Sequence, residues 1–146
     1  MEANKLQYIR ALTREFVREL GFIKDKKYDF PLTHFLRHLL LEVSRNPKKG
    51  AVDLAAVLLT DKANISRGLK SLIKDGHLKE SINTEDRRKK IIKLTAKGKK
   101  VVKTVNDYSN KRLSNAFDPI SNIDVEKIVT GLELMNSALQ KARRYS

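Results

Sequence analysis

Apolar residues recur along this chain mainly at the three- and four-residue spacing of an amphipathic helix. Six such stretches predict helices: Leu6 to Leu20, Leu32 to Val43, Val52 to Leu59, Asp61 to Lys74, Thr95 to Phe117, and a last one through Leu139 that Ser121 or Asp124 caps. Two strand-like runs, Leu78 to Ile82 and Ile91 to Leu94, flank a charged tip between the fourth and fifth helices. The predicted order is αααα-ββ-αα, a mostly α fold with one small sheet.

Length and composition narrow the class of protein. The 146 residues have the size of one domain, and 40% of them are apolar, so we expect the chain to fold. Cysteine is absent, which excludes a disulfide framework, a thiol redox sensor, a zinc ribbon and a cysteine nucleophile. Residues 1–20 lack a secretory apolar stretch, and the longest apolar runs are far shorter than the roughly 18 residues of a membrane span. We therefore expect a soluble, cytoplasmic protein.

The charge of the chain is strongly positive and unevenly distributed. The formal net charge is +14, which favours a polyanionic partner, either nucleic acid or an anionic membrane surface. The window from Lys62 to Lys103 alone holds 14 basic and 4 acidic residues, a net charge of +10. The positive charge is thus concentrated around the predicted fourth helix and hairpin.

The fourth predicted helix has one apolar and one polar face. Its apolar positions follow i, i+4, i+7, i+8 spacing and are Ile65, Leu69, Leu72 and Ile73. The opposite face carries Asn64, Ser66, Arg67, Lys70, Ser71 and Lys74. The short turn Leu59-Thr60-Asp61 joins this helix to the third, which is the spacing of a helix-turn-helix. We expect the polar face to meet DNA; the alternative is a polar face that only contacts solvent.

The side chains on this polar face suit different parts of a duplex. Arg67 can form a forked pair of hydrogen bonds with O6 and N7 of guanine, and Asn64 can do the same with N6 and N7 of adenine. Ser66, Lys70 and Lys74 suit phosphates, which set register and affinity but not sequence.

The tip of the predicted hairpin is densely basic. Arg87 and Arg88 are followed by Lys89 and Lys90, and arginines presented in this way are attracted by the negative potential of a narrow minor groove. Lys89 is expected to anchor the tip on the DNA backbone. Asp86 can pair with Arg88 and orient it, although an exposed pair contributes only about 0–1 kcal/mol to stability. The alternative is an ordinary charged turn.

Several of these segments together resemble the MarR family of winged-helix transcription regulators. The matching segments are Leu54-Ala55, Asn64 to Leu69, Leu72 to Leu78, Asp86-Arg87-Arg88 and Leu94-Thr95-Ala96-Lys97-Gly98. The resemblance covers nearly the whole chain, because the flanking helices have the lengths and order that the family uses for dimerisation. It implies one domain over residues 1–146, with dimerisation helices over 1–45 and 101–146 and a winged helix-turn-helix lobe over 46–100.

The resemblance also implies a function. Members of the family are homodimers that bind a pseudo-palindromic operator, usually as repressors, with recognition helices in successive major grooves. By this resemblance Arg88, paired with Asp86, reaches the minor groove, and Arg87 is the alternative or accompanying contact. The long apolar stripes of the outer helices point to the same twofold homodimer, unless they pack against one another within one chain.

Two residues depart from the pattern of the family. Gly68 lies inside the predicted recognition helix, where glycine costs roughly 0.5–1 kcal/mol relative to alanine. Lys97 lies in the first turn of the next helix, where relatives often have an acidic residue that interacts favourably with the helix dipole.

Family members commonly release DNA when a small molecule, often an aromatic acid, binds between the dimer helices and the DNA-binding lobe. The candidate lining residues, which are more simply explained as core or interface residues, are Phe16, Phe22, Phe30, His34, Phe35 and His38. His34, His38 and Glu42 are spaced to share one helical face and suggest a metal platform. Ordinary interface histidines are the favoured interpretation, so no metal and no cofactor is expected.

No arrangement of catalytic residues is evident, and we expect no enzyme. The alternatives to an operator-binding regulator are a winged-helix module that binds an acidic protein, a general architectural nucleic-acid-binding protein, and an RNA-binding protein. Aromatic residues make up only 6% of the chain, which disfavours recognition of single strands by stacking.

Overall fold

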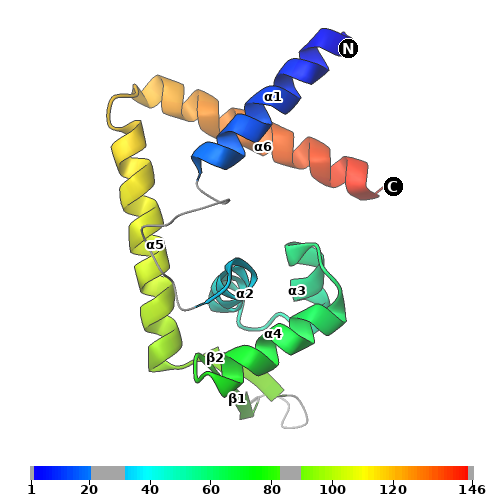
Figure 1. The fold of residues 1–146 in the computed structure, drawn as a ribbon, viewed down its shortest axis with the longest axis vertical. Coiled ribbons are helices and arrows are strands. Elements are labelled where there is room, and N and C mark those ends of the chain that lie inside the picture. The colour runs from blue at the N-terminus through cyan, green and yellow to red at the C-terminus, as the bar shows by residue number, and fades with distance from the viewer. Residues whose placement is uncertain (1, 21–31, 83–89, 145–146) are drawn as a thin grey trace. The chain divides into compact units, whose positions relative to one another are not determined.

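The computed structural model describes residues 2–20, 32–82 and 90–144 (Figure 1). Within these ranges the elements are α1 (Ala3–Glu19), α2 (His34–Arg45), α3 (Ala51–Leu58), α4 (Lys62–Lys74), β1 (Leu78–Ile82), β2 (Lys90–Leu94), α5 (Ala96–Phe117) and α6 (Asn122–Arg144). The predicted αααα-ββ-αα order and the mostly α fold class are confirmed. Ser121 caps α6, because its Oγ accepts a hydrogen bond of 3.2 Å from the N–H of Asp124.

The chain divides into two compact units, Met1–Phe35 and Leu36–Ser146. The first unit contains α1, an amphipathic helix without a buried residue. Its apolar side chains Leu6, Leu12 and Phe16 are each exposed by more than two fifths. None of the described helices combines the length and the apolar character that crossing a membrane requires.

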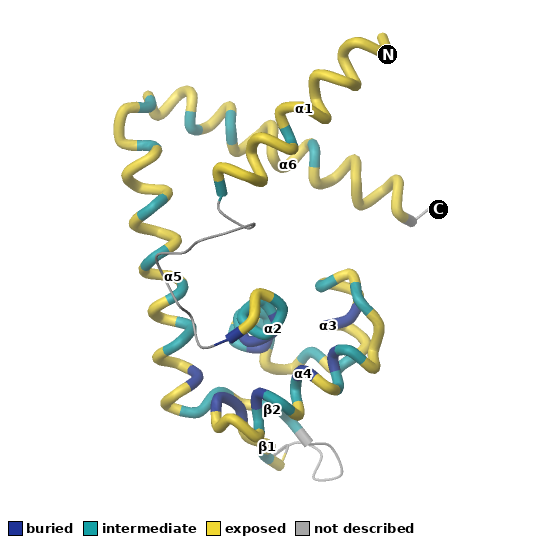
Figure 2. The backbone as a smooth tube through the Cα atoms, viewed as in Figure 1, coloured by how far each residue is buried: buried dark blue, intermediate teal, exposed yellow. Residues whose placement is uncertain are grey.

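The core of the second unit is built from α2, α3, α4 and β1. Its buried apolar residues are Leu39, Leu40, Val43, Leu54, Ala55, Ile65, Leu72 and Leu78. Figure 2 shows these buried positions along α2, α3, α4 and the hairpin, whereas α6 is exposed or half-buried along its length. Burying a side chain of this size contributes about 1.5–3 kcal/mol to folding, so the helix-turn-helix region carries the apolar core.

A tight turn connects α3 to α4. Leu59 ends α3 in the left-handed region with a φ of 53°, which costs a non-glycine residue roughly 1–2 kcal/mol. This conformation lets the N–H of Thr60 donate to the carbonyl of Ala55 at 3.1 Å. Asp61 then caps α4, because its Oδ1 accepts the N–H of Asn64 at 2.6 Å. The turn therefore fixes where the helix α4 begins.

The hairpin is an antiparallel pair in which Leu78 faces Leu94 and Ile82 faces Lys90. We call β1, β2 and the connecting residues 83–89 the wing. Its stem consists of the two strands β1 and β2. The connecting residues lie outside the described ranges.

The end of α4 follows a Schellman motif. Gly76 has a φ of 74°, a conformation that glycine adopts without a steric penalty. The N–H of Gly76 donates to the carbonyl of Ile73 at 3.0 Å, and the N–H of His77 donates to that of Leu72 at 2.8 Å. The sequence Asp75-Gly76 therefore ends the helix and directs the chain into β1.

The carbonyl of His77 joins the end of α4 to the start of α5. It accepts the N–H of Thr95 at 3.1 Å, and the Thr95 hydroxyl faces the carbonyls of Gly76 and His77 at 2.6 and 3.1 Å. The same Thr95 hydroxyl accepts the N–H of Gly98 at 3.1 Å and so caps α5. A Cβ on Gly98 would lie 3.1 Å from the carbonyl carbon of His77 and closer still to its oxygen. We call these contacts of His77, Thr95 and Gly98 the α4–α5 junction.

Lys97 adds a charged contact to this junction. Its Nζ donates to the carbonyl of Asp75 at 2.7 Å, at the C-terminal end of α4. A cation there interacts favourably with the dipole of α4. Lys97 is unfavourable for the dipole of α5, but it stabilises the C-terminal end of α4.

We expect replacement of glycine by alanine to have opposite effects on stability at two helical glycines. Gly98→Ala should lower the free energy of unfolding by about 1–3 kcal/mol, because the added methyl group meets the backbone of His77. Gly131→Ala, in the exposed middle of α6 with no atom within 4 Å of the added Cβ, should raise it by about 0.5–1 kcal/mol. Urea unfolding of both variants measures the difference, and equal effects would contradict the close approach at Gly98.

Candidate nucleic-acid interface

The helix α4 presents one continuous exposed face. Ile65, Gly68 and Leu72 are buried on its inner side, as the predicted apolar spacing requires, and Leu69 and Ile73 are half-buried beside them. The exposed positions of the helix are Lys62, Ala63, Arg67, Lys70 and Lys74. The glycine inside the helix therefore lies on the core side and not on the exposed face.

The exposed face of α4 is positively charged. In the part of the chain that the structure describes, none of the four basic side chains Lys62, Arg67, Lys70 and Lys74 pairs with a carboxylate. The ion pairs Glu42–Arg45, Lys103–Asp107 and Asp124–Lys127 all lie on other helices. Positive charges that no acidic neighbour neutralises attract phosphates from a distance.

Two polar residues of α4 are held by local hydrogen bonds. The Nδ2 of Asn64 donates to the hydroxyl of Thr60 at 3.0 Å, and Asn64 is half-buried. The Oγ of Ser66 donates to the carbonyl of Lys62 at 2.9 Å, so this hydroxyl must rotate before it can donate to a phosphate. The structure thus brings Asn64, Ser66, Arg67 and Lys70 together on one helix.

The remaining predicted DNA contacts lie outside the described residues. Asp86, Arg87, Arg88 and Lys89 belong to the segment 83–89. Their predicted roles remain predictions.

The predicted effector residues are distributed over both units. Phe22 and Phe30 lie outside the described ranges, Phe16 lies on α1, and His34 and Phe35 begin α2 within the first unit. His38 belongs to the second unit. Among the described residues no group of three or more His, Cys, Asp or Glu side chains is arranged to hold a metal ion. Glu42, the third member of the suggested metal platform, pairs with Arg45 at 3.6 Å.

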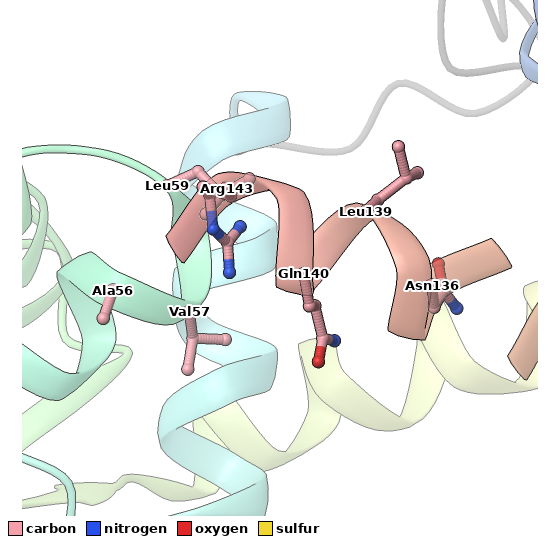
Figure 3. A pocket seen from close by; sticks show the side chains of 7 residues that line it. All are labelled: Ala56, Val57, Leu59, Asn136, Leu139, Gln140 and Arg143. Carbon is pink, nitrogen blue, oxygen red and sulfur yellow. The ribbon is translucent and has the colours of Figure 1, made fainter. Parts of the chain in front are cut away.

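A cavity of about 510 Å³ lies between α3 and α6 (Figure 3). Its lining residues are Ala56, Val57, Leu59, Asn136, Leu139, Gln140 and Arg143. None of them was among the predicted effector residues, because no local sequence spacing links two helices so far apart along the chain.

Part of the chain matches a known protein family. Residues 33–98 match the model of a winged helix DNA-binding domain family. This part of the chain is therefore similar to a winged helix DNA-binding domain. This matched region spans α2 to the start of α5 and includes the whole exposed face of α4 and the α4–α5 junction.

One curated relative and two solved structures are similar to this chain. The relative is an uncharacterized HTH-type transcriptional regulator, YfiV of Bacillus subtilis (strain 168), 26% identical over 92 residues that cover 63% of this chain and 58% of the relative. A MarR protein from Peptoclostridium difficile is 21% identical with a TM-score of 0.69, and the similarity covers 97% of this chain and 90% of that one. Streptococcus pneumoniae FabT, solved in complex with DNA, is 15% identical with a TM-score of 0.71, covering 94% and 96%. The resemblance to the MarR family is thereby confirmed at the level of fold.

Sequence reasoning missed three residues that hold α4 and the α4–α5 junction in place. Thr60, Thr95 and Lys97 each bond a residue across a turn or between elements. A threonine four residues before Asn64 was a usable signal for the first of these bonds. No local spacing marks the other two, because their partners lie 18 to 22 residues away.

His77 is a buried histidine within the matched region, residues 33–98. Its exposed fraction is 2%, and within the described residues its Nδ1 has no hydrogen-bond partner. Burial lowers the pKa of His77 below its usual value of 6.5, the charge of Lys97 lowers this pKa further, and Asp75 opposes the shift. The neutral imidazole is therefore the form that fits the fold.

This lowered pKa predicts a loss of stability in mild acid. Below about pH 6.5 the unfolded chain takes up a proton at His77 that the folded chain resists. The neutral form of His77 therefore contributes fully to the free energy of unfolding above about pH 6.5. This contribution is lost as the pH falls from there towards the lowered pKa. Urea unfolding at pH 7.5 and 5.5 measures the decrease. His77→Leu should reduce this decrease in stability, and an unchanged pH dependence in His77→Leu would contradict the assignment.

Proposed function

We propose that this protein is a transcription regulator that binds double-stranded DNA through the exposed face of α4. The observation that carries the proposal is the set of four basic side chains on that face that pair with no carboxylate among the described residues, on a helix whose other side is buried in the core. The match to a winged helix DNA-binding domain supports it, and so does the similarity to FabT, which was solved in complex with DNA. The similarity to YfiV, described as an HTH-type transcriptional regulator, supports a role in regulation.

Different residues contact different parts of the DNA. Arg67 reads a guanine and Asn64 an adenine from the major groove, whereas Lys70 and Ser66 contact phosphates. In the wing, Arg88 oriented by Asp86 enters the minor groove, Arg87 accompanies it or replaces it, and Lys89 contacts the backbone. Together these contacts give a sequence-specific complex whose affinity falls steeply with salt.

The regulator acts as a homodimer on a pseudo-palindromic operator. Apolar residues of α1 and α6 are exposed in the single chain, among them Leu12, Phe16, Leu132 and Leu139. An amphipathic helix needs a partner for its apolar stripe, and a second copy provides one with twofold symmetry. Such a dimer places two α4 helices about one turn of DNA apart, roughly 34–36 Å.

Regulation by a small molecule is the remaining part of the proposal. The protein represses until an aromatic or anionic effector binds and releases the operator. The predicted residues for this step are Phe16, Phe22, Phe30, His34, Phe35 and His38. The cavity between α3 and α6 is a further candidate, because Arg143 in its lining can pair with a carboxylate.

DNA recognition is tested with duplexes selected from a random pool. The wild type should enrich one palindromic consensus. Arg67→Ala should weaken binding to that consensus by about 1–3 kcal/mol and relax one position in each half-site. Lys70→Ala should weaken binding to all duplexes alike and reduce the salt slope by about 1. Lys141→Ala removes the same charge from α6 and is the matched control. It should change neither the affinity for duplexes nor the salt slope.

Other outcomes would favour the alternative functions. Salt-dependent binding to every duplex without a consensus would indicate an architectural protein, and no binding to duplexes would favour a module that docks on an acidic protein. If Arg87→Ala together with Arg88→Ala left operator affinity unchanged, the minor-groove role of the wing would be wrong.

The dimer is tested by sedimentation equilibrium. The wild type should have twice the mass of one chain. Leu132→Glu places a charge on the exposed apolar stripe of α6 and should yield monomers, because a buried charge without a partner is strongly unfavourable. Thr130→Glu, two residues away and on the other side of the helix, should remain dimeric. A monomeric wild type at micromolar concentration would contradict the proposal.

A further inference from the structure

We propose that Thr60 is a positioning residue for base recognition: its hydroxyl holds the amide of Asn64 in the orientation that reads adenine. This inference rests on the proposed function, since it concerns how α4 recognises DNA. It assigns a role in specificity to a residue of the α3–α4 turn that is not on the exposed face of α4.

Asn64 is fixed at its backbone and at its side chain. Its N–H donates to Oδ1 of Asp61 at 2.6 Å, which places the residue in the first turn of α4. Its Nδ2 donates to Oγ1 of Thr60 at 3.0 Å, in a partly buried environment. Residues in the first turn of a recognition helix are those that meet base edges in a helix-turn-helix.

Thr60 is itself held firmly. Its N–H donates to the carbonyl of Ala55, which the left-handed conformation of Leu59 makes possible. Thr60 is half-buried, so water competes less for its hydroxyl than it would at an exposed position. The turn between α3 and α4 thus presents a hydroxyl at a defined place beside Asn64.

The bond leaves the adenine-reading groups of Asn64 available. An amide carries two N–H groups and one oxygen, and Thr60 occupies one N–H. Among the described residues no donor bonds Oδ1 of Asn64. Adenine offers an N6 amine and an N7 acceptor in the major groove, which match the free oxygen and the second N–H of the amide.

Without the hydroxyl, the amide loses this orientation. An unrestrained Asn64 can turn either its oxygen or its nitrogen towards the groove. The nitrogen side donates to O6 and N7 of guanine, so a freely rotating amide distinguishes adenine from guanine poorly. Ordering the side chain on binding also costs conformational entropy, which the bond to Thr60 removes in advance.

The experiment compares three single variants and one double variant on the duplex consensus that the wild type selects, together with duplexes in which each base pair is changed in turn. Thr60→Val removes the hydroxyl at nearly constant shape, Thr60→Ser keeps it, and Asn64→Ala removes the amide. We expect the preference for adenine over guanine at one position per half-site to fall about fivefold or more in Thr60→Val and in Asn64→Ala. Thr60→Ser should retain the preference, and Thr60→Val should have no further effect in an Asn64→Ala background. Thr60→Ala replaces Thr60→Val if the latter does not fold, as judged by urea unfolding.

Several results would overturn the inference. Thr60→Val with the base preference of the wild type would exclude a positioning role. A uniform loss of affinity at all positions would show that Thr60 only stabilises the turn. Unchanged discrimination in Asn64→Ala would show that Asn64 does not read the base. A wild type that selects no consensus would overturn the proposed function together with this inference, and this result differs from the other three because it appears before any variant is made.

Discussion

The carbonyl of His77 is the point at which the helix α4, the wing and α5 are held together. It accepts the N–H of Thr95, and Gly98 packs directly against it. The His77 N–H closes the end of α4 by donating to the carbonyl of Leu72, so the backbone of a single residue joins three elements. Any side chain at residue 98 would separate α5 from the hairpin. The position of α5 against the hairpin therefore depends on a contact that only glycine permits.

This constraint links the fold to the proposed recognition of DNA. A helix in the major groove and a wing in the minor groove bind together only if their separation is fixed, because base hydrogen bonds need donor and acceptor within about 3 Å. The two ends of α4 are fixed by different contacts: Asp61 and Thr60 at the start, and Gly76 and Lys97 at the end. The exposed basic face between them is left without acidic partners in the described chain. Local hydrogen bonds thus set the geometry of the exposed face of α4, and its basic side chains supply the attraction for phosphates.

Much of this fold was predictable from the sequence, because its local signals agree with one another. The apolar spacing of Ile65 and Leu72 sets the buried face of α4, and Asp61 and Gly76 mark its two ends. The role of Lys97 was not predictable, because its partner Asp75 lies 22 residues earlier and is brought close only by the hairpin. The cavity between α3 and α6 was missed for the same reason. The predicted contacts of residues 86–89 lie outside the described ranges and stay predictions.

The most direct test of the central claim is native-state hydrogen exchange at the amides of the α4–α5 junction. If the His77 carbonyl unites the three elements, the amides of Thr95, His77 and Ile65 should exchange with the same opening free energy. Gly98→Ala should lower all three protection factors together, while the amides of α6 change less. If α4 kept its full protection in Gly98→Ala while Thr95 lost its own, the junction would be a local contact and the account would be contradicted.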